Sequence, residues 1–140
     1  MAHIRDDGVF DAPLQTIWEC LQSPQDHTHG AFAVSKVLDQ KGNALVMEVN
    51  VRDPPSGTSR RETVRRMMDP PRGFDVVYLE GPSKGTRHRH TYTPLGDKTR
   101  VEVEGDSRIH GMDDSEIRRS ILAYFDDLST EDNAALQRFA

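Results

Sequence analysis

His88, His90 and Tyr92 occupy alternate positions within one short stretch of the chain. Successive side chains of a β-strand point to opposite faces, so in a strand these three would share one face. An imidazole titrates near neutral pH and can take up and return a proton. A phenol hydroxyl can hold a carbonyl or enolate oxygen, and an arginine can stabilise the negative charge that forms there. The pattern therefore predicts a polar row suited to acid–base chemistry or to orienting a ligand.

A metal site is an alternative interpretation of the two histidines. The run His88-Arg89-His90 places two imidazoles on one face of a strand, a spacing that suits zinc if a third ligand is supplied. His27 and His29 are candidates for that third ligand. The chain has a single cysteine, so no cysteine pair can complete such a site. We therefore assign no metal and no cofactor, and ordinary core histidines remain a further interpretation.

The direction of the row follows from the turn that comes after it. Gly96-Asp97 suits a two-residue hairpin turn, which makes Leu95 and Lys98 direct neighbours and fixes the pairs beyond them. The pairs predicted for the inner face are His88 with Gly105, His90 with Val103 and Tyr92 with Val101. The pairs predicted for the outer face are Arg87 with Asp106 and Arg89 with Glu104, each of which joins opposite charges. A glycine opposite His88 should also leave space beside the imidazole.

The two preceding strands supply further candidates for the inner face. A five-residue loop from Gly81 to Gly85 places Phe74, Val76 and Tyr78 on the same face as the histidines. The strand from Thr58 to Met68 has two permitted orientations. One turns Arg61, Thr63, Arg65 and Met67 inward, and the other turns Arg60, Glu62, Val64, Arg66 and Met68 inward. Both bring arginine into the interior, where an uncompensated charge is costly, so the interior should be wet, ion-paired or filled by a ligand.

Turn signals at short intervals indicate the remaining strands. They are Lys41-Gly42-Asn43, the stretches 53–57, 69–73 and 81–85, and Gly96-Asp97. The segments between them have the length of strands, and several alternate in polarity. The spacing predicts a six-strand antiparallel meander, preceded by a strand at His3–Phe10.

Helices are predicted on both sides of the meander. The first begins near Pro13, and its apolar face consists of Leu14, Ile17, Trp18 and Leu21. A second short helix is expected at Ser23-Pro24. The C-terminal helix begins with a capping box of Asp113 and Glu116, followed by an apolar stripe of Ile117, Ile121, Tyr124, Phe125 and Leu128. Ser129 with Asp132 resembles another cap, which predicts a kink at that point.

This order of elements, over essentially the whole chain, resembles the START-like (SRPBCC, helix-grip) superfamily, which includes birch-pollen allergens, polyketide cyclases and aromatases, and small lipid-transfer proteins. The matching residues are Phe10-Asp11-Ala12-Pro13, the helix that carries Trp18, and the hairpin from Tyr92 to Val101. The resemblance implies one α+β domain over residues 1–140, with a curved antiparallel sheet of about seven strands wrapped around a long C-terminal helix.

A cavity between sheet and helix is the binding site that the resemblance implies. The ligand-binding residues expected there are Phe74, Val76, Tyr78, Arg66, Val103, Gly105, Ile121 and Phe125. The expected function is binding of a small hydrophobic or amphipathic molecule. The alternative is a cyclase, dehydratase or isomerase that uses His88 or His90 with Tyr92 and an arginine as catalytic groups. A second alternative is a regulatory or interaction module that presents its arginine-rich strand to an acidic partner.

Composition restricts the classes of function. A net charge of −5 argues against nucleic acid as a partner, although residues 52–72 carry six arginines against three acids. No stretch reaches the roughly 20 apolar residues of a membrane span, and Met1 to Phe10 lacks the apolar run of a signal peptide. A single cysteine fits a reducing compartment, so we expect a cytoplasmic protein. The oligomeric state, a homodimer included, is left open.

Overall fold

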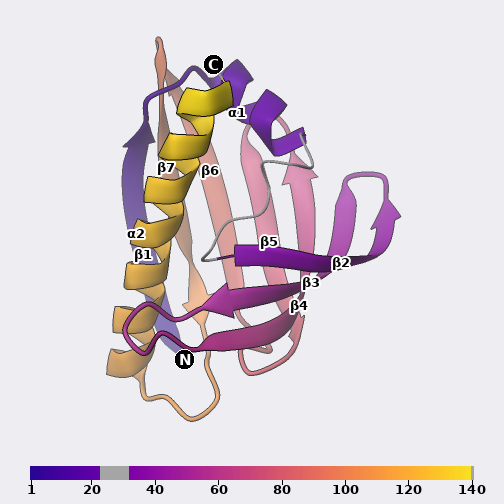
Figure 1. Ribbon diagram of the computed structural model, residues 1–140, viewed down its shortest axis with the longest axis vertical. Coiled ribbons are helices and arrows are strands. Elements are labelled where there is room, and N and C mark those ends of the chain that lie inside the picture. Colours follow the sequence, from indigo (N-terminus) through magenta and orange to yellow (C-terminus); the bar gives the residue numbers. More distant parts are fainter. Residues whose placement is uncertain (23–31, 140) are drawn as a thin grey trace.

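The part of the chain that the structure describes, residues 1–22 and 32–139 of a computed structural model, forms seven strands and two helices (Figure 1). The elements are β1 (Ala2–Phe10), α1 (Leu14–Gln22), β2 (Phe32–Lys41), β3 (Ala44–Arg52), β4 (Ser59–Asp69), β5 (Gly73–Glu80), β6 (Arg87–Leu95), β7 (Lys98–Ser107) and α2 (Asp114–Phe139). The order agrees with the turn signals. The helix expected at Ser23-Pro24, and also His27 and His29, lie outside the described residues.

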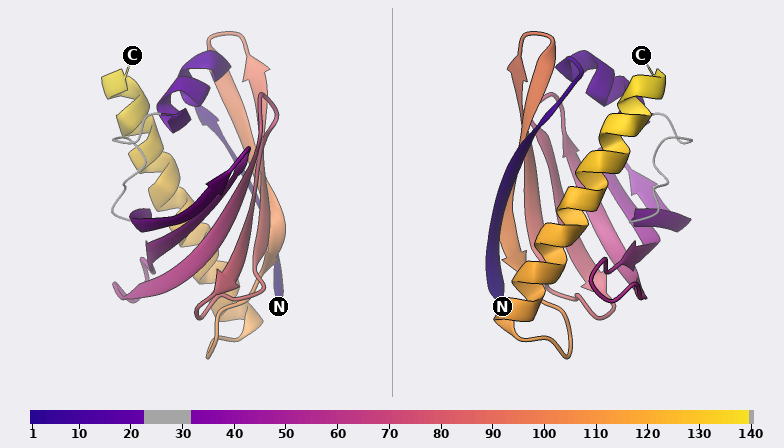
Figure 2. Two further views of the ribbon diagram at one scale, coloured as in Figure 1. Left: turned by 90° about the vertical axis from the view of Figure 1, so that its right-hand side faces the viewer. Right: turned by 60° about the vertical axis from the view of Figure 1, so that its left-hand side comes forward.

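The strands form one antiparallel sheet in the order β1-β7-β6-β5-β4-β3-β2. The sheet is strongly curved, and α2 crosses its concave side (Figure 2). Helix α1 lies near the C-terminal end of α2, where the indole nitrogen of Trp18 donates a hydrogen bond of 3.1 Å to the Pro71 carbonyl. The hydrophobic core fills the space between the concave face and the two helices. The predicted α+β, helix-grip architecture is confirmed.

The hairpin of β6 and β7 has the register that the Gly96-Asp97 turn predicts. All the predicted inner-face and outer-face pairs occur, from Leu95 with Lys98 to Arg87 with Asp106. Gly105, however, has a different role from the one expected. A Cβ at this position would collide with the main chain of Arg87 and His88. The glycine therefore permits close approach of two strands and does not leave space beside the imidazole.

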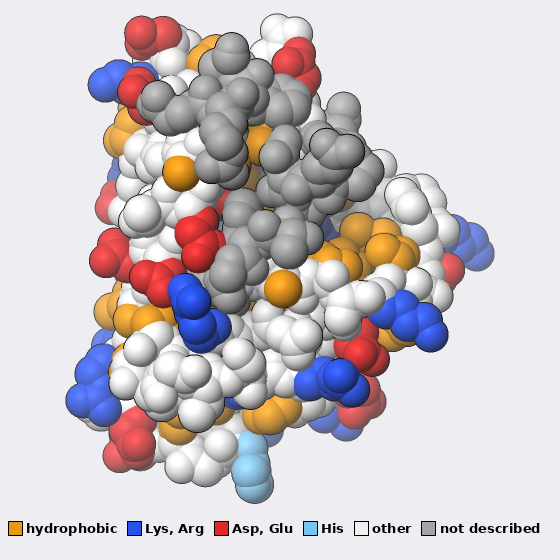
Figure 3. Space-filling view, in the orientation of Figure 1, with side chains coloured by type: hydrophobic (Ala, Val, Ile, Leu, Met, Phe, Trp, Pro, Cys, Tyr) orange, Lys and Arg blue, Asp and Glu red, His pale blue; other side chains and the backbone are white. Residues whose placement is uncertain are grey.

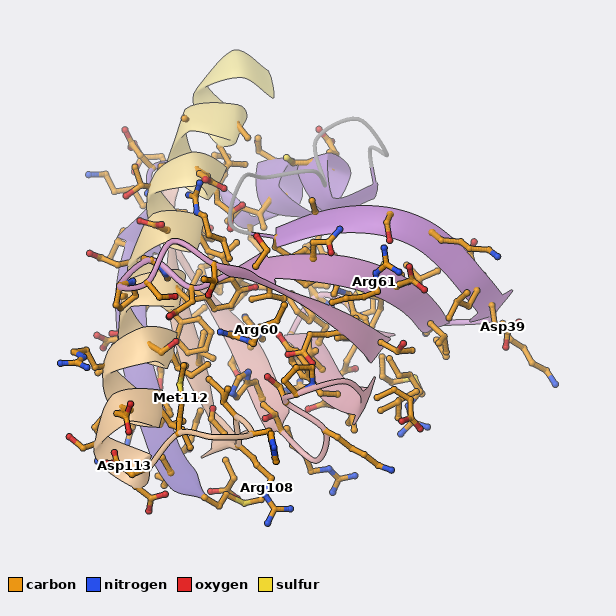
Figure 4. All side chains as sticks on the ribbon, turned by 60° about the horizontal axis from the view of Figure 1, so that its bottom comes forward. Asp39, Arg60, Arg61, Arg108, Met112 and Asp113 are labelled. Carbon is orange, nitrogen blue, oxygen red and sulfur yellow. The ribbon has the colours of Figure 1, made fainter. Side chains whose placement is uncertain are left out.

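Strand β4 has the second of the two orientations that the sequence permits. Its inward residues are Arg60, Glu62, Val64, Arg66 and Met68. Val64 is fully buried opposite Met47 of β3, whereas Arg61 and Arg65 are exposed on the outer face. Figure 4 shows Arg60 close to α2 and Arg61 pointing away from it. Two arginines of one strand therefore lie inside the fold.

A buried polar cluster joins the sheet to the N-terminal half of α2. Asp53, which is 2% exposed, accepts hydrogen bonds of 2.5 Å from the hydroxyls of Ser56 and Ser120. Arg60 lies close by, with its Nε 3.6 Å from a carboxylate oxygen of the buried Glu62. We refer to Asp53, Ser56, Arg60, Glu62 and Ser120 as the Asp53 cluster. Within this cluster, the inward-facing Arg60 has two acidic neighbours, Glu62 and Asp53.

Helix α2 begins with the predicted capping box. The amide of Glu116 donates to the Asp113 carboxylate at 2.8 Å, and the amide of Asp113 donates to the Glu116 carboxylate at 3.3 Å. The second cap predicted at Ser129 is wrong, because the helix continues without interruption to Phe139. Ser129 instead lies over Gly8 of β1, where the helix packs along the sheet. No helix in the described ranges is long and apolar enough to cross a membrane.

Helix α2 packs mainly along β1, at one edge of the sheet, so that β2 and β3 at the other edge project beyond it (Figure 1). Hydrophobic side chains gather at the surface of this projecting part (Figure 3). Val37 and Leu38 of β2 are about half exposed there. The helix therefore closes only one part of the concave face.

Candidate functional site

A cavity of about 120 Å³ lies between the sheet and the C-terminal half of α2. Eight of the eleven residues predicted for the site line it: Phe74, Val76, Tyr78, His88, His90, Tyr92, Arg66 and Phe125. Val103, Gly105 and Ile121 do not line it. Val103 and Ile121 are buried in the core, and Gly105 has no side chain to contribute. The cavity is displaced toward α1, which moves it away from these three positions.

Further residues that were not predicted for the site also line the cavity. They are Phe10, Ile17, Cys20, Phe32, Val101, Tyr124, Leu128, Asp132 and Leu136. Two signals pointed to some of them, since Val101 is the predicted partner of Tyr92 and Tyr124 lies on the apolar stripe of the helix. No comparable signal exists for Phe32, because its place at the cavity depends on how β2 closes the sheet.

Both histidines of the row are neutral at physiological pH. His88 is buried, its Nε2 lies 2.7 Å from the Ser107 hydroxyl, and burial lowers its pKa to about 4. The ring of His90 stacks on Phe74 at a centroid distance of 4.4 Å and an interplanar angle of 14°. Burial, together with the nearby His88 and Arg66, holds the pKa of His90 well below its usual value. Neutral imidazoles can accept a proton or a hydrogen bond within the cavity.

Three tyrosines contribute protonated hydroxyls to the same wall. Burial raises the pKa of Tyr78 to about 12 and raises the pKa values of Tyr92 and Tyr124 as well. The Tyr92 ring meets the edge of Trp18 at a centroid distance of 5.7 Å. No hydrogen bond between described residues joins His88 or His90 to Tyr92. The row thus lines one space without forming a hydrogen-bonded catalytic pair.

Arg66 enters the cavity between two phenylalanine rings. Its guanidinium carbon lies 5.0 Å from the centroid of Phe74 and 5.7 Å from that of Phe32. Burial lowers the pKa of this guanidinium. Within the described ranges, no group of three His, Cys, Asp or Glu side chains could hold a metal ion. Arg66 is therefore the main positive charge of the cavity wall.

The arginine-rich strand does not present one surface. Arg60 and Arg66 face the interior, whereas Arg61 faces outward and pairs with Glu48 at 3.5 Å. Arg65 is exposed on the same outer face. The excess of arginine that the sequence shows between residues 52 and 72 is therefore divided between the inside and the outside of the sheet.

Comparison with known proteins identifies the fold. No protein-family model matches the chain, and no curated protein matches it. Among solved structures, the Zhui aromatase/cyclase from Streptomyces sp. R1128 is similar with a TM-score of 0.71 and 19% identity, covering 98% of this chain and 92% of that chain. A START superfamily protein from Mycobacterium smegmatis is similar with a TM-score of 0.72 and 12% identity, and the match covers both chains fully. The structure of Ara h 8.0201 is similar with a TM-score of 0.74 and 9% identity, and the match covers 97% of each chain.

These likenesses define the class of structure. The chain has the START-like, helix-grip fold, as its order of elements predicts. Identities of 9–19% establish a shared fold and no more. The function therefore has to be argued from the cavity itself.

Proposed function

We propose that the protein binds a small hydrophobic or amphipathic molecule in the cavity between the sheet and α2. The observation that carries this proposal is the cavity itself, because a fully packed interior would leave no such space. Ring and branched side chains form most of its wall, and a few polar groups converge on it, as is typical of ligand pockets. The START-like fold supports the same function, since one similar structure is that of an aromatase/cyclase.

Filling the cavity should abolish binding without unfolding the protein. Val76 lines the cavity, whereas its neighbour Val77 points to the outer face of β5. We expect Val76→Phe to weaken binding of toluene, a neutral aromatic molecule of the size of the cavity, by at least about tenfold, or about 1.4 kcal/mol. Val77→Phe, the matched control, should bind as the unaltered protein does. A titration followed by NMR measures the affinity and circular dichroism checks the fold; equal affinities of the two variants would place toluene outside the cavity.

The alternative is an enzyme that removes a proton next to a carbonyl group, of the cyclase, dehydratase or isomerase kind. One observation favours it: the imidazole of His90 and the guanidinium of Arg66 line the same cavity. In such a step the proton passes from carbon to the imidazole, and the electron pair passes to the carbonyl oxygen beside the guanidinium. The lack of a hydrogen bond between His90 and Tyr92 in the described structure makes ligand binding the better-supported function.

Hydrogen exchange on a small diketone tests this alternative. If His90 is a base, the protein should speed exchange of the central hydrogens of acetylacetone with D₂O, followed by proton NMR. His90→Phe should remove the acceleration, and the exposed His110→Phe should retain it. An exchange rate that is the same with and without the protein would contradict base catalysis by His90.

A further inference from the structure

Arg66 is a partly buried cation whose Nε has no hydrogen-bonding partner among the described residues. Its guanidinium forms no hydrogen bond and no ion pair with any described residue, and its Nε is shielded from solvent. The contacts that it does make are with the faces of Phe32 and Phe74. A guanidinium carries five N–H donors in a fixed planar arrangement, and ring faces satisfy none of them as an oxygen would.

The second inward arginine of the same strand provides a comparison. Two buried nitrogens of Arg60 also lack a hydrogen bond to a described residue, but this guanidinium forms an ion pair with Glu62 at 3.6 Å, and its charge also acts on Asp53. Arg66 forms no ion pair with a carboxylate of the described residues. Asp132 lines the same cavity from α2 and acts on Arg66 through space, but the two side chains do not form an ion pair. Arg60 therefore has a carboxylate at ion-pair distance, whereas Arg66 faces the cavity with its nearest recorded acid, Asp132, beyond that distance.

We propose, building on ligand binding in the cavity, that the bound molecule is a small organic anion whose carboxylate or equivalent oxygen group is received by Arg66. A planar guanidinium matches a carboxylate through two parallel hydrogen bonds, and exclusion of water strengthens that pairing. The anion supplies the missing partner, and its hydrocarbon part displaces water from the apolar wall.

The size and shape of the cavity define the rest of the ligand. A volume of about 120 Å³ is of the order of an engineered cavity of roughly 150 Å³ that accepts benzene. Phe74 offers one ring face beside the guanidinium, and His90 stacks on the same ring. A compact aromatic or branched carboxylate satisfies both the charge and the volume, whereas a long acyl chain exceeds the volume.

Two probes that share a shape but differ in charge show how much the charge contributes to binding. Benzoate and benzamide are both planar, and only benzoate is charged at neutral pH. We expect the unaltered protein to bind benzoate at least about tenfold more tightly than benzamide in an NMR titration. Arg66→Met should weaken benzoate binding by at least about tenfold and change benzamide binding little. Arg65→Met, at the neighbouring outward position, should change neither.

A stability measurement excludes a purely structural role for Arg66. Replacing a partly buried charge that forms no ion pair with a described residue by an apolar side chain of similar length should leave the melting temperature of the ligand-free protein unchanged or raise it. A fall of ~5 °C or more for Arg66→Met would overturn the proposal, because it would show that the cation stabilises the empty fold.

The binding results distinguish failure of this inference from failure of the proposed function. Equal affinity for benzoate and benzamide would overturn the anion proposal and leave ligand binding intact. Acetate binding as tight as benzoate binding would also overturn it, since the ring would then contribute nothing. If neither aromatic probe binds, the anion proposal fails, and toluene binding by the Val76→Phe and Val77→Phe proteins decides whether the cavity binds apolar molecules at all.

Discussion

Replacing Asp53 with alanine is expected to lower the free energy of unfolding by about 3–5 kcal/mol, because it removes one partner from a buried charged cluster. The hydroxyls of Ser56 and Ser120 would lose their common acceptor. Arg60 would lose one of the carboxylates that offset its charge. Burial acts to raise the pKa of the Asp53 carboxyl, but hydrogen bonds from Ser120 and Ser56 outweigh it and lower that pKa. The carboxylate is therefore charged at neutral pH, and its loss is felt in full.

Chemical denaturation at pH 7 measures this effect, and an exposed ion pair supplies the control. Asp7 lies 2.8 Å from Arg100 on the surface, with both side chains well exposed. Asp7→Ala should change the free energy of unfolding by no more than about 1 kcal/mol. If the two alanine variants are equally stable, the Asp53 cluster does not hold α2 to the sheet in the way described here.

Lowering the pH should destabilise the fold, and the effect should begin at pH values well above those at which carboxylates titrate. Burial lowers the pKa of His88 to about 4, whereas the unfolded chain takes up a proton on this residue below about pH 6.5. The unfolded state therefore binds more protons between these values, and the free energy of unfolding falls as the pH drops. The loss is about 3 kcal/mol for His88 alone by pH 4. His90, also neutral in the fold, adds a loss of the same sign.

Denaturation curves between pH 7 and pH 4 test this prediction. His88→Gln keeps a polar group near Ser107 and should flatten the dependence on pH, whereas the exposed His110→Gln should leave it unchanged. His3 acts in the opposite direction, since hydrogen bonds with Asp106 and Glu104 raise its pKa. Its contribution is present below about pH 6.5 and is lost as the pH rises through the raised value. A profile without dependence on His88 would contradict a neutral, buried imidazole.

Local chemistry was sufficient to predict the inward row of the site. A two-residue turn has few permitted geometries, so Gly96-Asp97 determined the register of β6 and β7 and thereby the direction of His88, His90 and Tyr92. The capping box of α2 was predictable for the same reason, because it depends on residues three positions apart. Such features require no knowledge of distant parts of the chain.

Other features depended on contacts that local patterns do not encode. The orientation of β4 could not be chosen, because both faces carry arginine and the longer loop before it does not determine the register. In the observed orientation Val64 enters the core and Glu62 and Arg60 join the Asp53 cluster, which brings together residues from different elements. The cap expected at Ser129 failed for a similar reason. A serine in mid-helix resembles a helix start, and only its position over Gly8 shows why the helix continues.

The short turn between β6 and β7 also limits how this protein can change over generations. Side chains alternate along a strand, so one residue inserted between Tyr92 and the turn would move His88, His90 and Tyr92 together to the outer face and bring Arg87, Arg89 and Thr91 to the inner one. Point substitutions can alter one wall position at a time, but an insertion there exchanges the whole row at once. Descendants of this sequence should therefore change these residues one at a time, while the spacing from His88 to Gly96 stays fixed.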